Sequence, residues 1–466
     1  MSTEETTTDT YRDLYVSPEK IYPRQINGIF ARLRIYTVIL LLGCYYITPW
    51  LTWNGQQAVL FDLPARQFST ILALLFWPQD FIYLTLLLII AAVGLFLFTT
   101  IAGRVWCGYA CPQTVWTETF LWLEELVEGN RNKRIKLDKS PWNANKIIRK
   151  SLKQFLWVSF SLFTGYTFVG YFSPIQELGT GIINFSLGPW EWFWVFLYSL
   201  ATYGNAGWLR EQVCLHMCPY ARFQSSMFDK DTLIISYDTK RGESRGKRQK
   251  NSDYQLQGLG DCIDCNQCVQ VCPTGIDIRD GLQYECIACA ACIDVCDNVM
   301  DKMGYDKGLI KYTTEVEEKS GGKEKTHFFR PRTIYYISIF VFVVGAFFYL
   351  ISNRIPLKID IIRDRNALYT ETFSGDIENI YTLKILNMSQ INQTYHLSVE
   401  GFKDILLKGK NTFVIDSGEV LTLPVRLRIP AEQLKKRSNN IRFIIQATEG
   451  EQFRAQSTGK FLGPKK

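Results

Sequence analysis

The sequence predicts a multi-domain membrane protein with a five-helix transmembrane part, a cysteine-rich domain outside the membrane and a β-sandwich at the carboxyl end. Three observations predict this fold class. Five windows without a charged residue are long enough to cross a bilayer, eight of the 13 cysteines lie between Cys262 and Cys296, and apolar and polar side chains alternate after residue 354. With 466 residues, the chain is also long enough for about three domains.

The transmembrane part is predicted from length and charge. A helix that crosses a bilayer needs about 20 apolar residues, and buried helices of soluble proteins seldom run that far without a charge. Tyr and Trp near the ends of the first and fourth windows suit the membrane interfaces. We therefore expect five spans, at Ile35–Trp53, Phe81–Ile101, Phe155–Ile175, Trp192–Leu209 and Thr333–Asn353.

Lysine and arginine predict the orientation of these spans. Residues 103–153 carry many of them, whereas residues 173–189 carry none, and cytoplasmic loops are the ones enriched in these residues. The amino terminus does not read as a cleaved signal peptide. The predicted parts are a cytoplasmic N-terminal segment (1–34), four transmembrane helices (35–209), a cytoplasmic domain (210–332), a fifth transmembrane helix (333–353) and an extracytoplasmic β-sandwich (354–466).

The basic run at residues 240–250 belongs to the predicted cytoplasmic domain. Such a run can lie against anionic lipid headgroups, or it can be a solvated linker. The sequence does not decide between these two interpretations.

One cysteine spacing of x2, x2, x3 occurs twice in the cytoplasmic domain. This is the spacing of bacterial two-cluster ferredoxins, in which the fourth cysteine of each run binds the other cluster. It predicts a ferredoxin-like domain with two 4Fe-4S clusters and a crossed set of ligands. The first cluster takes Cys262, Cys265, Cys268 and Cys296, and the second takes Cys286, Cys289, Cys292 and Cys272.

Other uses of these eight cysteines fit less well. Cys-x-x-Cys pairs also hold structural zinc, but zinc sites rarely need a third cysteine two residues further on, twice. A disulfide framework belongs to an oxidising compartment. The second run ends in Cys296-Asp297 where the bacterial pattern has proline, so the pattern predicts a proline turn at Pro273 but not at Asp297.

A second cysteine repeat, Cys-x-x-x-Cys-Pro, follows the second and fourth predicted spans. The membrane part therefore consists of two related hairpins, and halves of this kind usually meet at a shared site. We expect helices to begin at Pro112 and Pro219, which would place Cys111 and Cys218 at helix N-termini and favour their thiolates. Arg104 and Arg210 are close enough in sequence to assist.

The repeat supplies four candidate copper ligands, since soft thiolates select Cu(I), zinc or iron–sulfur clusters. A neighbouring imidazole and thioether would also suit copper. As alternatives, these cysteines could pack as small apolar side chains or form a dithiol/disulfide redox pair. The copper candidates are Cys107, Cys111, Cys214 and Cys218, with His216 and Met217 as further candidates.

The carboxyl-terminal domain shows alternation of period two, for example at residues 357–361, 381–385 and 425–429. This pattern is typical of half-buried strands, and their spacing between Gly, Pro and Asn turns predicts an immunoglobulin-like β-sandwich. The domain contains no cysteine and no catalytic constellation. We expect it to bind a partner.

Taken together, the five spans, the two Cys-x-x-x-Cys-Pro elements, the duplicated ferredoxin motif and the terminal sandwich resemble the family of cytochrome c oxidase accessory proteins called CcoG, FixG or RdxA. The resemblance covers nearly the whole chain. It implies a bacterial inner-membrane protein that assembles cbb-type oxidases and acts as a cupric reductase, converting Cu(II) to Cu(I). It also implies two 4Fe-4S clusters on the eight cysteines, copper on Cys107, Cys111, Cys214 and Cys218, and a periplasmic sandwich.

Two other functions stay open. One is quinol-linked electron transfer, in which the membrane halves hold the quinone and the clusters relay electrons. The other is a non-enzymatic assembly scaffold with structural clusters. Expected partners are the membrane, subunits of a cbb-type oxidase or copper chaperones and transporters, and an unidentified electron donor. We expect no nucleic-acid partner, and the sequence is compatible with a homo-oligomer.

Overall fold

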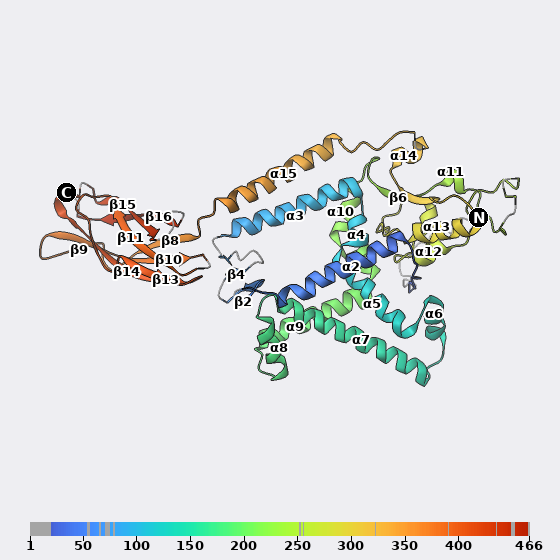
Figure 1. The fold of residues 1–466 in the computed structure, drawn as a ribbon, viewed down its shortest axis with the longest axis horizontal. Coiled ribbons are helices and arrows are strands. Elements are labelled where there is room, and N and C mark those ends of the chain that lie inside the picture. Colours follow the sequence, from blue (N-terminus) through green and yellow to red (C-terminus); the bar gives the residue numbers. More distant parts are fainter. Residues whose placement is uncertain are drawn as a thin grey trace, which may run out of the picture. The chain divides into compact units, whose positions relative to one another are not determined.

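The structure is a computed structural model that describes residues 20–53, 56–64, 67–69, 75–77, 80–250, 253–254, 256–321, 323–389, 391–434, 436–448 and 453–464. The chain divides into two compact units. One unit contains residues 1–50 and 89–341, and the other contains residues 51–88 and 342–466. Helices α3 (Phe81–Ala102) and α15 (Pro331–Ser352) contribute to both units (Figure 1).

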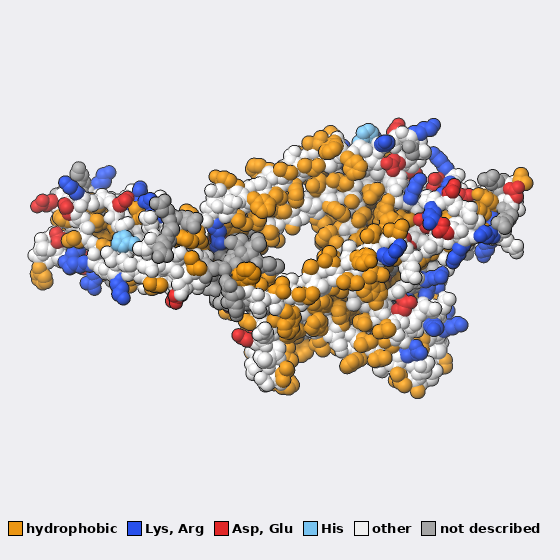
Figure 2. All heavy atoms as spheres, viewed as in Figure 1, with side chains coloured by type: hydrophobic (Ala, Val, Ile, Leu, Met, Phe, Trp, Pro, Cys, Tyr) orange, Lys and Arg blue, Asp and Glu red, His pale blue; other side chains and the backbone are white. Residues whose placement is uncertain are grey.

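Among the described residues, three helices are long and apolar enough to cross a membrane. They are α2 (Ile29–Ile47) with its 3-10 extension η2 (Thr48–Trp50), α3 and α15. Hydrophobic side chains cover the face of these helices that Figure 2 shows. They coincide with the first, second and fifth predicted spans.

The third and fourth predicted spans fall on α7 (Ala144–Val169) and on α9 (Pro189–Thr202), which continues as the π-helix η4 (Tyr203–Leu209). Helix α7 is long enough to cross a membrane, but neither it nor α9 is among the helices that are both long and apolar enough, because their apolar positions are mixed with Ser, Thr, Tyr and Gly. They pack closely on each other, since a β-carbon on Gly165 would lie 2.3 Å from Oγ of Ser199. Large apolar side chains on the outer face remain exposed, including Phe155 and Leu200.

Shorter helices join these long ones within the first unit. Helices α5 and α10 begin at Pro112 and Pro219, as predicted. A proline suits the first helical turn because its missing N–H would have no partner there. The remaining helices of this part are α4 (Val105–Tyr109), α5 (Pro112–Glu128), α6 (Arg131–Lys139), α8 (Ile175–Ile183), the π-helix η5 (Val213–Met217) and α10 (Pro219–Met227).

The cysteine-rich part of the first unit has a small antiparallel pair of strands, β6 (Ile234–Tyr237) and β7 (Ile310–Thr313), with short helices around it. Its core consists of buried aliphatic side chains together with Cys262 and Cys268. The helices are α11 (Thr239–Gly242), α12 (Gln267–Val271), η6 (Ile278–Asp280), α13 (Ala291–Met303) and α14 (Glu315–Ser320).

The second unit contains the predicted sandwich. One sheet has the order β12–β14–β10–β8, with β9 paired to β10, and the other has the order β13–β11–β15–β16. Tyr381 and Phe443, one from each sheet, are fully buried and pack edge to face. The strands are β8 (Leu357–Arg363), β9 (Thr370–Glu371), β10 (Asp376–Asn387), β11 (Gln393–Glu400), β12 (Leu406–Lys408), β13 (Thr412–Ile415), β14 (Val420–Pro430), β15 (Ser438–Ala447) and β16 (Arg454–Leu462), with the 3-10 turn η7 (Ala431–Gln433).

The segment between η2 and α3 adds short strands to the second unit. Strands β1 (Thr52–Trp53) and β2 (Gln56–Gln57) form one antiparallel pair. Strands β3 (Leu60–Asp62), β4 (Gln67–Ser69) and β5 (Leu75–Phe76) form a three-stranded sheet.

Candidate functional site

The two ferredoxin repeats fold into the same local backbone shape. Asp264 and Asn266 in the first repeat, and Ala288 and Ala290 at the equivalent places in the second, all have φ between 50° and 59°. Alanine rarely adopts this left-handed conformation, so surrounding structure must hold it there. Helices α12 and α13 begin directly after Asn266 and Ala290. The repeated spacing therefore produces two equivalent cysteine loops.

The first crossed set of cysteines lines a single cavity of about 370 Å³. Apolar side chains from α13 and β7 close it, and the guanidinium of Arg279 lies at its wall. Arg279 forms ion pairs with Asp264 and Asp277, at 2.8 Å and 2.5 Å. The sulfurs that share this cavity belong to Cys262, Cys265, Cys268 and Cys296.

The second crossed set lines a separate cavity of about 340 Å³. Pro273, Thr274 and several aliphatic side chains form the rest of its wall. The sulfurs that share it belong to Cys272, Cys286, Cys289 and Cys292, and Cys268 also borders it. Four thiols around an apolar cavity fit a 4Fe-4S cluster, whose ligands are cysteine thiolates. The structure thus brings together both sets that the crossed spacing predicts.

The four Cys-x-x-x-Cys-Pro cysteines lie at two pairs of neighbouring elements, α4 with α5 and η5 with α10. Cys107 lies on α4, Cys111 precedes α5, Cys214 lies on η5 and Cys218 precedes α10. Each is half-buried, and they are close enough to influence one another electrostatically across the two hairpins. The two halves therefore meet at a shared cluster of thiols, which we call the thiol tetrad.

The tetrad is not arranged as a ready-made site for a single ion. Within the described parts of the chain, no three Cys, His, Asp or Glu side chains are placed to hold one metal ion. The Cys107 thiol donates a hydrogen bond to Oε1 of Gln224, at 3.5 Å. His216 and Met217 are exposed, and no described contact joins either of them to the tetrad.

Burial is the largest influence on the pKa of Cys107, Cys111 and Cys214. It raises the pKa of Cys107 to about 12 and the pKa of Cys214 to about 11. Burial also raises the pKa of Cys111, although the backbone N–H groups of Thr114 and Gln113 act in the opposite direction. The start of α5 thus favours the Cys111 thiolate in the predicted direction, but desolvation of the charged form exceeds the effect of the helix and the net pKa is raised.

The two arginines singled out in the sequence have different positions. Arg104 is buried and lowers the pKa of both Cys107 and Cys214, against the larger effect of burial. Its guanidinium also donates hydrogen bonds to the backbone carbonyls of Tyr284 and Ala221. Arg210 instead forms an ion pair with Glu124, at 2.7 Å. Of the two arginines, Arg104 is thus the one that lowers the pKa of tetrad thiols.

The thiol tetrad and the second cysteine loop touch directly. A β-carbon on Gly108 would lie 2.8 Å from the Cα of Cys289 and 2.8 Å from the carbonyl oxygen of Ile287. Only a residue without a side chain permits this approach. Gly108 stands between Cys107 and Cys111, so the frame of the tetrad lies against the loop of the second cavity.

Helix α2 is tied to the same domain by two side chains. Arg34 donates a hydrogen bond from Nη1 to the backbone carbonyl of Cys289. Asp294 of α13 accepts hydrogen bonds from the backbone N–H groups of Phe30 and Ala31, at 3.2 Å and 2.7 Å, and so caps the start of α2. The sequence alone pointed to no role at this site for either Arg34 or Asp294.

Known families match most of this chain. Residues 209–315 match the family described as "4Fe-4S dicluster domain", residues 84–134 match "4Fe-4S binding domain", and residues 347–464 match the "IG-like fold at C-terminal of FixG". The second of these ranges includes Cys107 and Cys111.

Relatives with names match this chain over most of its length and over most of their own. "Nitrogen fixation protein FixG" of Rhizobium meliloti is 38% identical over 422 residues, which cover 83% of this chain and 80% of that protein. "Protein RdxA" of Cereibacter sphaeroides is 40% identical over 399 residues, which cover 83% of this chain and 84% of that protein. A solved structure, "Crystal structure of FixG-related protein from Vibrio parahaemolyticus", is 36% identical over 23% of this chain and 95% of its own, with a TM-score of 0.21.

Proposed function

The chain belongs to the family of FixG and RdxA, and from that premise we propose that it reduces Cu(II) to Cu(I) during assembly of a cbb-type cytochrome c oxidase. At the coarser level it is an iron–sulfur electron-transfer protein of the membrane with two 4Fe-4S clusters. The finer proposal concerns the acceptor of the electron, which is the copper ion as substrate.

The single observation that carries the proposal is the contact between Gly108 and Cys289. Through it, the frame of the thiol tetrad lies in van der Waals contact with a proposed ligand of the second cluster. When bound, the two clusters store and deliver single electrons. A copper ion held by the tetrad would therefore be separated from that source by little more than one loop.

The tetrad would bind and retain the product of the reaction. Reduction adds one electron to Cu(II) and gives Cu(I), and thiolates prefer the softer Cu(I) ion. Because burial raises the pKa of Cys107, Cys111 and Cys214, copper binding to these thiols must displace their protons. Arg104 would stabilise the thiolates that form, since it already lowers the pKa of Cys107 and Cys214.

The remaining assignments belong to the same proposal. The two crossed sets, Cys262, Cys265, Cys268 and Cys296, and Cys272, Cys286, Cys289 and Cys292, hold the clusters. We place the protein in a bacterial inner membrane as a multi-pass protein, with residues 1–34 and 210–332 in the cytoplasm and the sandwich at 354–466 in the periplasm. The sandwich would bind an oxidase subunit or a copper chaperone or transporter.

Metal analysis of a cysteine variant tests this function. The variant Cys107→Ser with Cys214→Ser, purified without oxygen in the presence of copper, should lose most of its bound copper and keep about eight irons. Cys44→Ser is the matched control, because Cys44 is exposed on α2 and outside all three cysteine sets. Unchanged copper content in the double variant would refute the role of the tetrad.

A further inference from the structure

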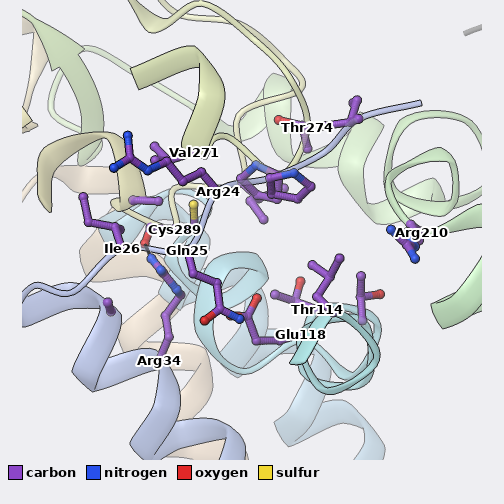
Figure 3. A pocket seen from close by; sticks show the side chains of 18 of the residues that line it. Arg24, Gln25, Ile26, Arg34, Thr114, Glu118, Arg210, Val271, Thr274 and Cys289 are labelled. Carbon is purple, nitrogen blue, oxygen red and sulfur yellow. Dashed lines mark hydrogen bonds between the residues drawn. The ribbon is translucent and has the colours of Figure 1, made fainter. Parts of the chain in front are cut away.

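A cavity lies on the side of the second cysteine loop that faces α2 and α5. It encloses about 1180 Å³ of space, part of it open to solvent. Arg34 of α2, Glu118 of α5 and Cys289 line it together (Figure 3). The residues from Ile21 to Asn27 supply another wall. The cavity adjoins the cavity of the second cysteine set, and the two share Cys289 and Ile287 in their walls.

An occupant of this cavity would lie against the redox domain. Ile287, Cys289 and Ala291, all in the second cysteine loop, form part of its wall. Cys214 of the thiol tetrad borders it as well. A bound molecule would thus be close to the second cluster site, which makes the cavity suitable for a molecule that exchanges electrons.

One wall of the cavity is continuous with the apolar surface of a membrane-spanning helix. Ile35 of α2 lines the cavity and is 40% exposed. It belongs to a series of exposed apolar side chains on α2 that includes Leu33 and Ile39. Leu121 and Trp122 of α5 extend the apolar lining. This continuity favours an occupant that arrives from the lipid.

Two carboxylates line the cavity from one face of α5. Glu118 and Glu125 are seven residues apart, which puts them on the same side of a helix. Burial raises the pKa of both. Among the described side chains, Oε2 of Glu125 is buried without a hydrogen-bond partner. Such groups can accept protons from a bound molecule.

Three of the four arginines that line the cavity are already engaged with other groups, and the fourth, Arg24, is exposed and donates to Oε1 of Gln267, at 3.5 Å. Arg34 is bonded to the carbonyl of Cys289, and Arg134 and Arg210 are within ion-pair distance of Glu124, at 3.6 Å and 2.7 Å. Arg134 also donates to the carbonyl of Pro23, at 2.6 Å. A nucleotide donor such as a reduced nicotinamide carries two phosphates and would need more cations than Arg24 alone to bind them. The lining therefore fits an uncharged occupant better.

We propose that this cavity binds a quinol, and that the quinol is the electron donor of the protein. The inference rests on the proposed function, since it supplies the electrons that reach copper. Oxidation breaks the two O–H bonds of the quinol and leaves the quinone. One electron goes to each of the two clusters, and one proton goes to each carboxylate, Glu118 and Glu125, and from there to solvent.

The experiment uses the full-length protein in lipid vesicles without oxygen, with decylubiquinol or menadiol as the probe. Loss of the visible cluster absorbance reports reduction. Ile35→Trp fills the apolar wall and should slow reduction by about tenfold or more, equal to the loss of at least about 1.4 kcal/mol of binding. Ile39→Trp is the matched control, because Ile39 is an exposed isoleucine of the same helix that does not line the cavity.

A second variant separates proton transfer from simple electrostatics. Glu118→Gln with Glu125→Gln removes two negative charges, which by itself would make cluster reduction easier. If the carboxylates take the protons, the variant should instead reduce about 10- to 100-fold more slowly with quinol, while dithionite reduces it as fast as the parent. Iron content near that of the parent shows that each variant is folded.

Two results would overturn the quinol site. One is that neither quinol reduces the parent protein although dithionite does, and the other is that Ile35→Trp behaves like Ile39→Trp. Copper reduction is measured separately, by adding Cu(II) to protein that dithionite has reduced. If that reaction fails while quinol still bleaches the clusters, the copper function is wrong and the quinol site stands.

Discussion

Gly108 and Cys289 approach so closely that a single methyl group cannot be placed between them, because a β-carbon on Gly108 would lie 2.8 Å from the Cα of Cys289. The residues are 181 positions apart in the sequence. This contact joins the Cys-x-x-x-Cys frame at the end of a membrane helix to the second ferredoxin loop. The electron path proposed for this protein passes through it.

Gly108→Ala should therefore damage the second cluster site. Alanine is the better helix former by about 1 kcal/mol, but its β-carbon would meet backbone atoms of Ile287 and Cys289, which cannot rotate away. We expect iron to fall from about eight toward four per protein, with loss of the resonance signal of interacting clusters.

Gly43→Ala on α2 is the control, because nothing lies within 4 Å of a β-carbon there. It should keep all of its iron. A full iron content in Gly108→Ala as well would contradict the tight contact.

Arg34 should raise the reduction potential of the second cluster. Its guanidinium is bonded to the carbonyl of Cys289, and a nearby positive charge stabilises the reduced, more negative state. Removing a positive charge that lies several ångströms from a cluster makes its reduction less favourable by on the order of 2 kcal/mol. For one electron this corresponds to about 90 mV. Arg34→Gln should lower one of the two potentials by this order in a redox titration.

Arg32→Gln provides the matched comparison, since Arg32 is an exposed arginine of the same helix. It should leave both potentials nearly unchanged. Equal shifts in Arg32→Gln and Arg34→Gln would show that the hydrogen bond to Cys289 has no particular effect.

Glu124 should stabilise the connection that joins η4 to η5, the helix that carries Cys214. It is fully buried and pairs with Arg210, Lys153 and Arg134. Burial raises the pKa of its carboxyl, but the pairs with Arg210 and Lys153 outweigh burial and hold the pKa below its ordinary value. Glu124→Gln removes the carboxylate that pairs with Arg210 and Arg134, while Lys153 keeps Glu128 at 3.2 Å, and should cost about 3 to 5 kcal/mol at neutral pH.

The pH dependence follows from the direction of that shift. A carboxyl with a lowered pKa contributes its full stability above the unfolded value of about 4.3 and loses it as pH falls through the folded value. In thermal unfolding, the melting temperature of Glu124→Gln should thus lie below that of the parent at pH 7. This difference in melting temperature should decrease at acidic pH. A difference that grows toward low pH would contradict the ion pairs, and Glu177→Gln, at an exposed position of α8, should melt at the same temperature as the parent.

Short-range features of the site could be predicted from the sequence. Cysteine spacing fixed the crossed sets, because the ligands of each loop lie within a few residues of one another. Proline at Pro112 and Pro219 fixed the helix starts because its effect is local. The sandwich followed from alternation of period two along its strands, which matches the two faces of a sheet.

Features that depend on distant packing could not be predicted. Arg34 and Cys289 are 255 residues apart, and Asp294 and Ala31 are 263 apart. No local pattern marks such pairs. The helix N-terminus at Cys111 suggested a thiolate, but the extent of burial that overrides it depends on the whole fold. The third and fourth spans stay predictions, since α7 and α9 are helical but only moderately apolar.

The most direct test of the account is to mix the protein, reduced without oxygen and freed of reductant, with one equivalent of Cu(II). The account predicts that cluster absorbance returns as Cu(I) appears, with one electron lost for each Cu(I) formed, and that Cys107→Ser with Cys214→Ser abolishes this exchange. Clusters that stay reduced in the presence of Cu(II) would contradict it.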